Sequence, residues 1–221
     1  MKNLVIAIDG PSGAGKGTLA RSIARALGYR HIDTGAMYRA VAWKATADGL
    51  PLDDEAAVAA LATRADLDQH DGLVLIDQHD VTRIIRTPEV DQAAARVAKL
   101  PRVREILVER QRALGAGGAV VMEGRDIGTV VFPEADVKIY LDASAEERAR
   151  RRVSDQARSG VPRTSMASVQ SELVARDRTD STRAIAPLTV APDAVYIDTT
   201  SMPIEAVVNH VIMLVHEKLT T

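Results

Sequence analysis

A glycine-rich stretch near the N-terminus constrains this chain more than any other feature. It follows an apolar run, residues 4–8, with only Asp9 between them. Glycine admits backbone angles that other residues avoid, so successive N–H groups can turn inward around phosphate oxygens. A helix that follows the stretch adds the positive end of its dipole, and the lysine of the stretch can reach the terminal phosphates of a bound nucleotide. The pattern therefore predicts a strand, a phosphate-binding loop and a helix, the loop comprising Gly10, Pro11, Ser12, Gly13, Ala14, Gly15, Lys16, Gly17 and Thr18.

One position of this loop departs from the usual pattern, in which Ser or Thr follows the lysine directly. Here Gly17 follows Lys16, and the hydroxyl comes one residue later, at Thr18. We therefore expect no protein ligand to a metal, and a Mg²⁺ ion held mainly by nucleotide phosphates and waters. The alternative, an ordinary glycine-rich turn, would need neither the lysine nor the apolar run before it.

Composition and charge narrow the class of protein. The chain has 221 residues, 46% hydrophobic and 3% aromatic, enough for one aliphatic core and a small appended domain. Its formal net charge of −2 argues against a nucleic-acid or membrane binder. It contains no cysteine, which excludes disulfides and a cysteine nucleophile. The first apolar run meets Asp9 too early for a signal peptide, and no later run could span a bilayer. We expect a cytoplasmic monomer without nucleic-acid or membrane partners.

Short apolar runs alternate with helix-like segments along most of the chain. This alternation predicts an α/β fold with a parallel sheet covered on both faces. A helix is expected to end at Gly28, Ser144 and Glu147 form a candidate capping box, and a terminal helix begins near Pro203. The expected strands after the first cover residues 30–33, 119–122, 137–141 and 194–197.

Two segments break the alternation. Between about residues 50 and 101 an acidic helix precedes two apolar runs, 73–76 and 81–85, which predict a hairpin around residues 77–80. We interpret this part as an inserted subdomain. Residues 154–165 carry few apolar anchors and are interpreted as a mobile flap.

Charged residues and glycines follow two of the predicted strands, at the sheet edge where α/β proteins place functional groups. Arg39 and Arg125 lie in these segments, and a guanidinium there suits bidentate capture of a second phosphate. A solvated surface charge is the alternative for any single arginine. Asp126 is interpreted either as a carboxylate that orients an arginine or a Mg²⁺-bound water, or as a structural or capping residue.

A third charged cluster lies late in the chain. Arg176, Asp180 and Arg183 are spaced to share one helical face, which is also the spacing of an intrahelical salt-bridge ladder. A salt-bridge ladder does not explain why the non-helical Ala186-Pro187 follows. Together with Arg148, Arg151 and Arg152, this cluster could surround transferring phosphates.

Six segments of the chain form a combination that none of them has alone: residues 10–18, 33–39, 86–90, 101–105, 124–133 and 183–188. Together they resemble the bacterial cytidylate kinase family, from about residue 3 to the C-terminus. The loop alone is similar to the whole group of nucleoside monophosphate kinases, and the combination with the long insert before Pro101 is more specific.

The resemblance implies a P-loop kinase core with a parallel five-stranded sheet flanked by helices, an inserted acceptor-binding subdomain and a short lid. Residues 1–40, 101–153 and 166–221 would form the core. Residues 41–100 would form the CMP-binding insert, and residues 154–165 the lid that closes over ATP.

The implied activity is Mg²⁺-dependent transfer of the ATP γ-phosphoryl group to CMP or dCMP. Catalysis would rest on Lys16, Arg125, Asp126 and Arg183. ATP would be bound by the loop 10–18 with Arg148, Arg151 and Arg152. CMP would be bound by Asp33, Thr34, Gly35, Tyr38, Arg39, Arg104, Arg125, Arg176, Asp180 and Arg183. Some members of the family have a serine that contacts cytosine where this chain has Ala95. The resemblance therefore supports recognition of the base less directly than recognition of the phosphate.

Three other classes share parts of this pattern. Another P-loop small-molecule kinase, with UMP, shikimate or gluconate as acceptor, has the same loop but does not require as many acceptor-side arginines. A regulatory GTPase would carry an Asn-Lys-x-Asp signature, and neither Asn3 nor Asn209 is followed by lysine. The negative net charge argues against a nucleic-acid-binding module.

Overall fold

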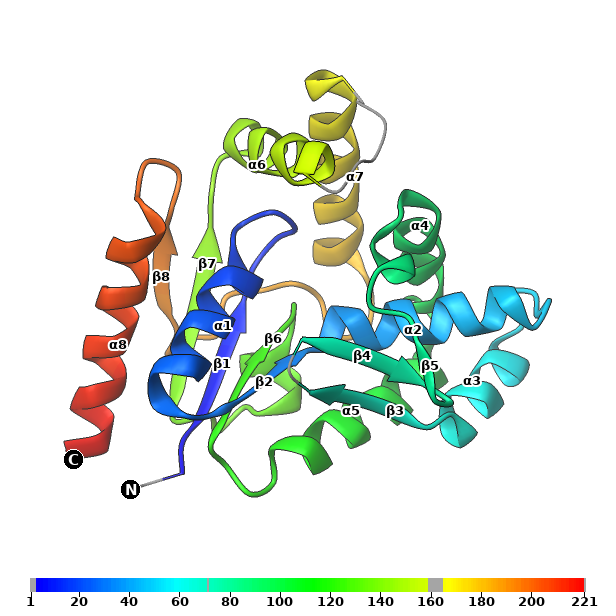
Figure 1. Ribbon diagram of the computed structural model, residues 1–221, viewed down its shortest axis with the longest axis horizontal. Coiled ribbons are helices and arrows are strands. Elements are labelled where there is room, and N and C mark those ends of the chain that lie inside the picture. Colours follow the sequence, from blue (N-terminus) through cyan, green and yellow to red (C-terminus); the bar gives the residue numbers. More distant parts are fainter. Residues whose placement is uncertain (1–2, 71, 159–164, 221) are drawn as a thin grey trace. The chain divides into compact units, whose positions relative to one another are not determined.

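The computed structural model describes residues 3–70, 72–158 and 165–220. The chain forms two compact units, one made of residues 1–31 and 117–221 and the other of residues 32–116. Each unit has its own hydrophobic core and is described separately. Figure 1 labels the elements of both.

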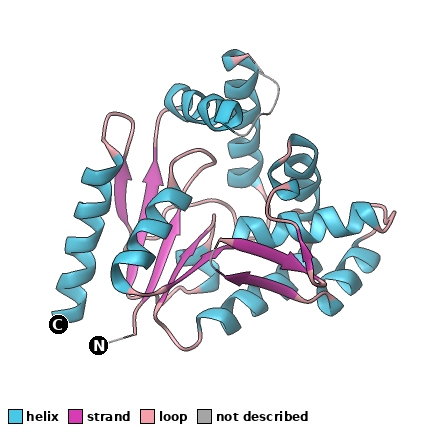
Figure 2. Ribbon diagram, viewed as in Figure 1, coloured by secondary structure: helices cyan, strands magenta, loops and turns pink. Residues whose placement is uncertain are grey.

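A five-stranded parallel sheet forms the centre of the first unit (Figure 2). Its order is β2-β6-β1-β7-β8, and the boundary between the units falls within β2. The sequence predicted all five strands, each to within one residue of its observed bounds. These are β1 (Val5–Asp9), β2 (Arg30–Asp33), β6 (Val120–Glu123), β7 (Val137–Asp142) and β8 (Val195–Asp198).

Two helices cover one face of this sheet. α1 (Lys16–Leu27) and α8 (Ile204–Thr220) pack on inward-facing side chains of β1 and β7, and this aliphatic cluster is the core of the unit. α1 ends at Gly28, whose left-handed backbone (φ 67°) forms the expected C-cap. A single π-helical turn, η2 (Ile127–Val131), follows β6.

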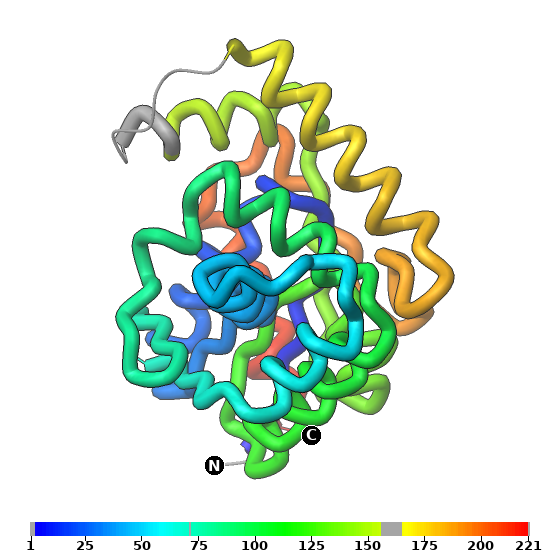
Figure 3. The backbone as a smooth tube through the Cα atoms, turned by 90° about the vertical axis from the view of Figure 1, so that its right-hand side faces the viewer, coloured from blue at the N-terminus to red at the C-terminus, as the bar shows by residue number. Residues whose placement is uncertain are grey.

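A helix pair, α6 (Ala145–Arg158) and α7 (Met166–Thr182), follows β7 (Figure 3). The two helices pack through Ala149, Val169 and Leu173. Within the segment expected to be a flap, 154–165, Ser154 to Arg158 continue α6 and Ser165 caps α7, and the flap itself stays a prediction. The remaining residues of that segment, 159–164, lie outside the described part of the chain.

The second unit combines four helices with a small antiparallel sheet. The sheet has the order β3-β4-β5, and Ala36, Ile76 and Ile85 are among the residues buried in the core of this unit. Trp43 packs against that core, its ring 6.2 Å from the His79 imidazole. The elements are α2 (Thr34–Ala47), α3 (Glu55–Arg64), β3 (Leu67–His70), β4 (Leu73–Ile76), β5 (His79–Asp80), η1 (Ile84–Arg86), α4 (Pro88–Val97) and α5 (Pro101–Gly115).

The hairpin of this unit differs from the expected one. Asp77 and Gln78 both have positive φ, 48° and 66°, and they form a two-residue turn that joins β4 directly to β5. The second expected strand, 81–85, is instead a turn that leads into η1. The sequence also missed β3, which pairs with the other edge of β4.

The second unit extends beyond the expected insert, residues 41–100. α2 and α5 are continuous helices that contact α4 and α3 respectively, so both belong to the unit of residues 32–116. The role of this unit in binding an acceptor stays a prediction. Within the described residues, no helix is both long and apolar enough to cross a membrane.

Candidate phosphate-binding site

The loop between β1 and α1 has the backbone that its glycines predict. Gly10, Gly13 and Gly15 all have positive φ, at 142°, 81° and 98°. A side chain on Gly10 would collide with the carbonyl of Leu141 in β7. No side chain caps α1, and its first turn holds no acidic residue. Its free N–H groups and positive dipole end are therefore available to an anion.

Lys16 is buried at the start of α1. Its Nζ donates to the carbonyl of Pro11, 2.7 Å away, which folds the side chain back over the loop. Burial lowers the pKa of Lys16 to about 7; the cations Arg125 and Arg176 act in the same direction, and Glu123 acts against them. A bound polyphosphate would supply the negative charge that favours the protonated lysine.

Asp9, at the end of β1, is a site residue that the sequence analysis missed. Its carboxylate accepts hydrogen bonds from the N–H groups of Ile127 and Gly128, at 2.8 and 2.7 Å. Burial raises its pKa to about 6, and these two bonds only partly offset the effect of burial. Asp9 thus ties the turn after β6 to the strand that leads into the loop. Its partners lie more than a hundred residues away, so no local signal reveals the role.

An ion-pair cluster joins the turn after β6 to the end of α7. Arg125 Nε donates to Asp180 Oδ2 at 2.9 Å. Arg183 Nη1 lies 3.8 Å from Asp180 Oδ1, and Arg183 Nη2 lies 3.8 Å from Asp126 Oδ1. Burial would raise the pKa of Asp180, but Arg125 and Arg176 outweigh it, and the pKa is lowered. The cluster holds two guanidinium groups in fixed places at the carboxyl end of the sheet.

The salt-bridge ladder is only part of this arrangement. α7 ends at Thr182, and Arg183 has an extended backbone, so it does not share a helical face with Arg176 and Asp180. The Asp126 carboxylate lies beside the Arg183 guanidinium, and the Asp126 backbone carbonyl accepts the N–H groups of Val130 and Val131. That Asp126 orients an arginine stays a prediction.

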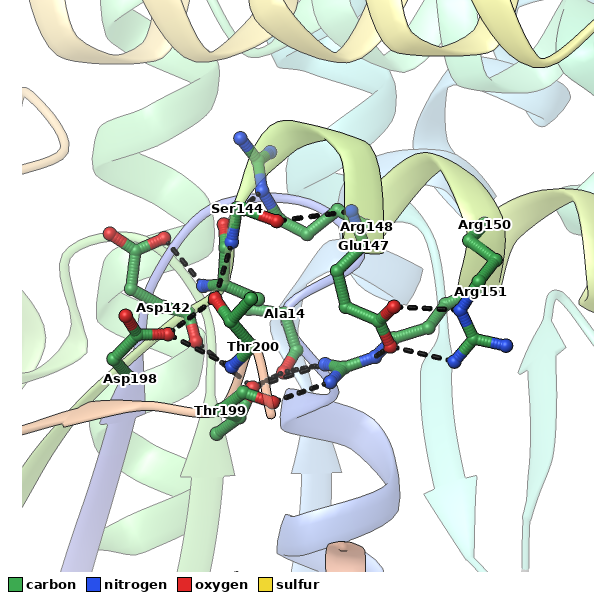
Figure 4. A network of polar contacts seen from close by, with 11 residues as sticks. Ala14, Asp142, Ser144, Glu147, Arg148, Arg150, Arg151, Asp198, Thr199 and Thr200 are labelled. Carbon is green, nitrogen blue, oxygen red and sulfur yellow. Dashed lines mark hydrogen bonds and ion pairs between the residues drawn. The ribbon is translucent and has the colours of Figure 1, made fainter. Parts of the chain in front are cut away.

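The arginines of α6 reach the phosphate loop through its carbonyl groups (Figure 4). Arg148 donates to the carbonyls of Ala143 and Ser12 and pairs with Asp177 of α7. Arg151 donates to Ala14 and to Thr199, in the turn after β8. Both arginines therefore bond to the protein, and their expected contact with ATP stays a prediction.

The capping box at the start of α6 is half formed. The N–H of Glu147 donates to Ser144 Oγ at 3.2 Å. The Glu147 carboxylate does not return the bond to the backbone of Ser144; it pairs instead with Arg150 and Arg151. Hydrogen bonds from these arginines lower the pKa of Glu147 to about 2.

In the second unit, Asp33 and the first turn of α2 form a separate polar cluster. Asp33 caps α2 by accepting the N–H of Ala36, and its other oxygen lies 2.9 Å from Arg86 Nη2. Burial opposes ionisation, yet Arg86 and Arg39 hold the pKa of Asp33 well below its usual range. Gln69 of β3 bonds to both the N–H and the carbonyl of Asp33. The sequence analysis missed Gln69, which belongs to the unpredicted strand.

The other predicted acceptor residues of this unit lie around the same helix, whereas Arg176 lies on α7 of the first unit. Arg39 Nε donates to Asp91 of α4 at 2.7 Å. The Arg104 guanidinium lies over the Tyr38 ring, 5.7 Å from its centroid, in a cation–π contact. Thr34 is buried. A side chain at Gly35 would stand only 3.0 Å from Arg39 Nη1, so the glycine leaves room for that guanidinium.

The fold and the loop define the class of protein. The first strand of a parallel sheet leads through a glycine-rich loop and a buried lysine into a helix that has no side-chain N-cap. This arrangement is a P-loop nucleotide-binding fold. Among solved structures, the shikimate kinase from Bacteroides thetaiotaomicron resembles this chain with a TM-score of 0.52 at 14% identity, over 96% of this chain and 98% of that one. That likeness supports the fold alone.

Sequence comparison places the chain more narrowly. The family model for cytidylate kinase matches residues 6–217. The cytidylate kinase of Desulfitobacterium hafniense (strain Y51) is 48% identical, with 100% of this chain and 96% of the relative covered. That of Geobacillus kaustophilus (strain HTA426) is 49% identical, with 99% of each covered. The chain belongs to the cytidylate kinase family, and it is a nucleoside monophosphate kinase. The resemblance stated from the sequence is thus confirmed.

Proposed function

We propose that this enzyme transfers the γ-phosphoryl group of ATP to CMP or dCMP in a Mg²⁺-dependent reaction, which gives ADP and CDP or dCDP. The observation that carries the proposal is family membership over nearly the whole chain. The geometry of the loop agrees with it, because an uncapped helix start beside a buried lysine is a site for a polyphosphate.

The proposed residue roles follow the family resemblance. The loop 10–18 with Arg148, Arg151 and Arg152 serves ATP, whereas Arg39, Arg125 and Arg183 bind the acceptor phosphate. Arg104, Arg176 and Asp180 serve the base and sugar. Asp33, Thr34, Gly35 and Tyr38 line the acceptor side. Several of these groups are already fixed by protein contacts, as Arg125 is by Asp180. Prior ordering of this kind lowers the cost of binding a phosphate.

Catalysis by these residues consists of positioning and charge stabilisation. The attacking atom is an oxygen of the acceptor phosphate, already largely ionised near neutral pH, so neither a protein nucleophile nor a strong general base is required. Lys16 and the arginines stabilise charge that develops on the transferring group. Closure of the site around ATP would exclude the water that otherwise hydrolyses it.

The donor set near the loop fits a magnesium ion bound chiefly through substrate. Among the residues that the structure describes, no three His, Cys, Asp or Glu side chains gather as a metal cage. Mg²⁺ typically keeps several waters and binds phosphates with few carboxylates. Glu123 and Asp126, at the carboxyl end of β6, are the carboxylates that its water ligands could contact. When bound, Mg²⁺ would supply positive charge that offsets the negative charge of the phosphate groups.

A coupled assay of ADP formation tests the proposal. With ATP and Mg²⁺, we expect turnover with CMP and dCMP and little with other nucleoside monophosphates. Shikimate and gluconate serve as negative controls. Turnover confined to one of these two would overturn the proposal. We also propose that the enzyme works as a cytoplasmic monomer, which sedimentation analysis and cell fractionation would check.

A further inference from the structure

The guanidinium of Arg151, on α6, makes four hydrogen bonds to protein atoms. Nε donates to Glu147 Oε1 at 2.8 Å, Nη1 to the Ala14 carbonyl at 3.2 Å and to Thr199 Oγ1 at 3.0 Å, and Nη2 to the Thr199 carbonyl at 2.7 Å. Figure 4 shows the guanidinium between α6, the phosphate loop and the turn after β8. This planar group therefore connects three segments that are distant in sequence.

Thr199 holds the other side of this connection. It is buried, and its hydroxyl lies 2.9 Å from the Asp142 carbonyl and 3.3 Å from the Ala14 carbonyl. Its N–H donates to the same Asp142 carbonyl at 2.8 Å. The acceptor that Thr199 offers to Arg151 is thus anchored to β7, and the guanidinium has little freedom to turn away.

The Ala14 carbonyl is the part of the loop that Arg151 contacts, and its direction fixes a neighbouring donor. In a trans peptide the C=O of one residue and the N–H of the next point in opposite directions. The described residues contain no cis peptide bond. A carbonyl of Ala14 held toward α6 therefore turns the N–H of Gly15 away from α6. Gly15, at φ 98°, can adopt this geometry without the strain of a side chain.

We infer that Arg151, supported by Thr199, is a positioning residue: it sets the direction of the Ala14–Gly15 peptide so that the Gly15 N–H faces the ATP phosphates. The inference rests on the proposed function only in taking ATP as the ligand of the loop. It differs from the role first expected of Arg151, which was direct contact with ATP.

Substitution of Arg151 by lysine separates the two roles. A direct phosphate ligand would be replaced in part by a lysine, which keeps the charge, whereas a fork that joins two carbonyls and a hydroxyl cannot be replaced by a point charge. We expect Arg151→Lys and Arg151→Met alike to weaken ATP binding about tenfold or more, the scale of one lost charge-assisted hydrogen bond. Calorimetry with ATP alone measures this effect. Arg151→Lys with wild-type ATP affinity would overturn the inference.

Arg150→Met is the matched control. Arg150 lies on the same helix and pairs with the same Glu147, but its side chain is 64% exposed. We expect ATP affinity within twofold of wild type for this variant. In turnover assays Arg151→Lys should raise KM for ATP and leave KM for CMP within twofold. Equal rises in both KM values would indicate a general structural defect and count against the inference.

Thr199→Val tests the same connection without touching a charge, and it applies even where the Arg151 variants fail to fold. The substitution removes the hydroxyl that accepts from Arg151 and keeps the shape of the side chain. We expect weaker ATP binding, restored by Thr199→Ser. Unchanged ATP affinity in Thr199→Val would contradict the inference. Failure of the proposed function looks different, since a wild-type protein that binds ATP but does not phosphorylate CMP leaves these binding results intact.

Discussion

Removal of the buried charge of Lys16 should stabilise the ligand-free protein while abolishing most of its activity. The pKa of Lys16 falls from 10.5 to about 7, chiefly because the ammonium is desolvated. At about 1.4 kcal/mol for each pH unit, the charged lysine costs on the order of 5 kcal/mol of folding free energy at neutral pH. Loss of its bond to Pro11 offsets about 1 kcal/mol of the gain. Lys16→Met should therefore raise the free energy of unfolding by several kcal/mol.

The sign of the pH dependence follows from the two pKa values. Below pH 7 the lysine is charged in the folded and the unfolded chain, and the full cost is present. Between about pH 7 and 10.5 only the unfolded chain holds the proton, so the wild type gains close to 1.4 kcal/mol of stability per pH unit relative to the variant. Above pH 10.5 the lysine is neutral in both the folded and the unfolded chain, so burial of its charge no longer lowers the free energy of unfolding. The advantage of Lys16→Met should thus shrink steadily with rising pH.

Urea denaturation of both proteins at half-unit steps from pH 7 to 9.5 measures this difference. Lys44→Met is the control, because Lys44 forms an i,i+4 pair with Asp48, the C-cap residue of α2, and its removal should change stability by a small amount. Parallel stability curves for wild type and Lys16→Met would refute the reasoning. Turnover by Lys16→Met or Lys16→Ala should fall at least about a hundredfold. Near-wild-type kcat would remove Lys16 from the catalytic set.

Three further substitutions test other parts of the structure. Arg125→Ala should raise KM for CMP and lower kcat with little change in ATP affinity. Calorimetry that shows lost ATP affinity and unchanged CMP affinity would instead assign Arg125 to ATP. Asp54→Ala removes the N-cap of α3 and should cost about 1 kcal/mol in urea denaturation, with Asp54→Ser close to wild type. Gly118→Ala should destabilise more than Gly28→Ala: both glycines have positive φ, but only Gly118 faces a neighbouring carbonyl, that of Asn3. Equal losses would show that the collision relaxes at no cost.

The sheet and the loop follow from local sequence because their signals are local. Each of the five apolar runs predicted for the parallel sheet is a strand, and the glycines and the lysine of the loop form one contiguous motif. The small sheet was less predictable. Its turn places Asp77 and Gln78 in left-handed conformations that glycine usually supplies, and β3 (Leu67–His70) lacks a continuous apolar run.

The sequence indicated candidate residues for the site but not the contacts that these residues make. Arg151 was expected to meet ATP because arginine suits phosphate, but its partners, Ala14 and Thr199, lie in other segments of the chain. The same holds for Asp9, whose partners follow β6. Hydrogen bonds between distant segments leave no periodicity or spacing in the sequence, so only the folded structure reveals them.

The location of Trp43 gives one unit an optical signal of its own. Trp43 is the single tryptophan of the chain, and it packs in the unit of residues 32–116 against His79. Tryptophan emission therefore follows the environment of that unit, whereas far-ultraviolet circular dichroism follows the helices of both. Coincident transitions by the two methods would mean that the chain unfolds as one cooperative body. Separate transitions would assign a melting step to each unit without any label being introduced.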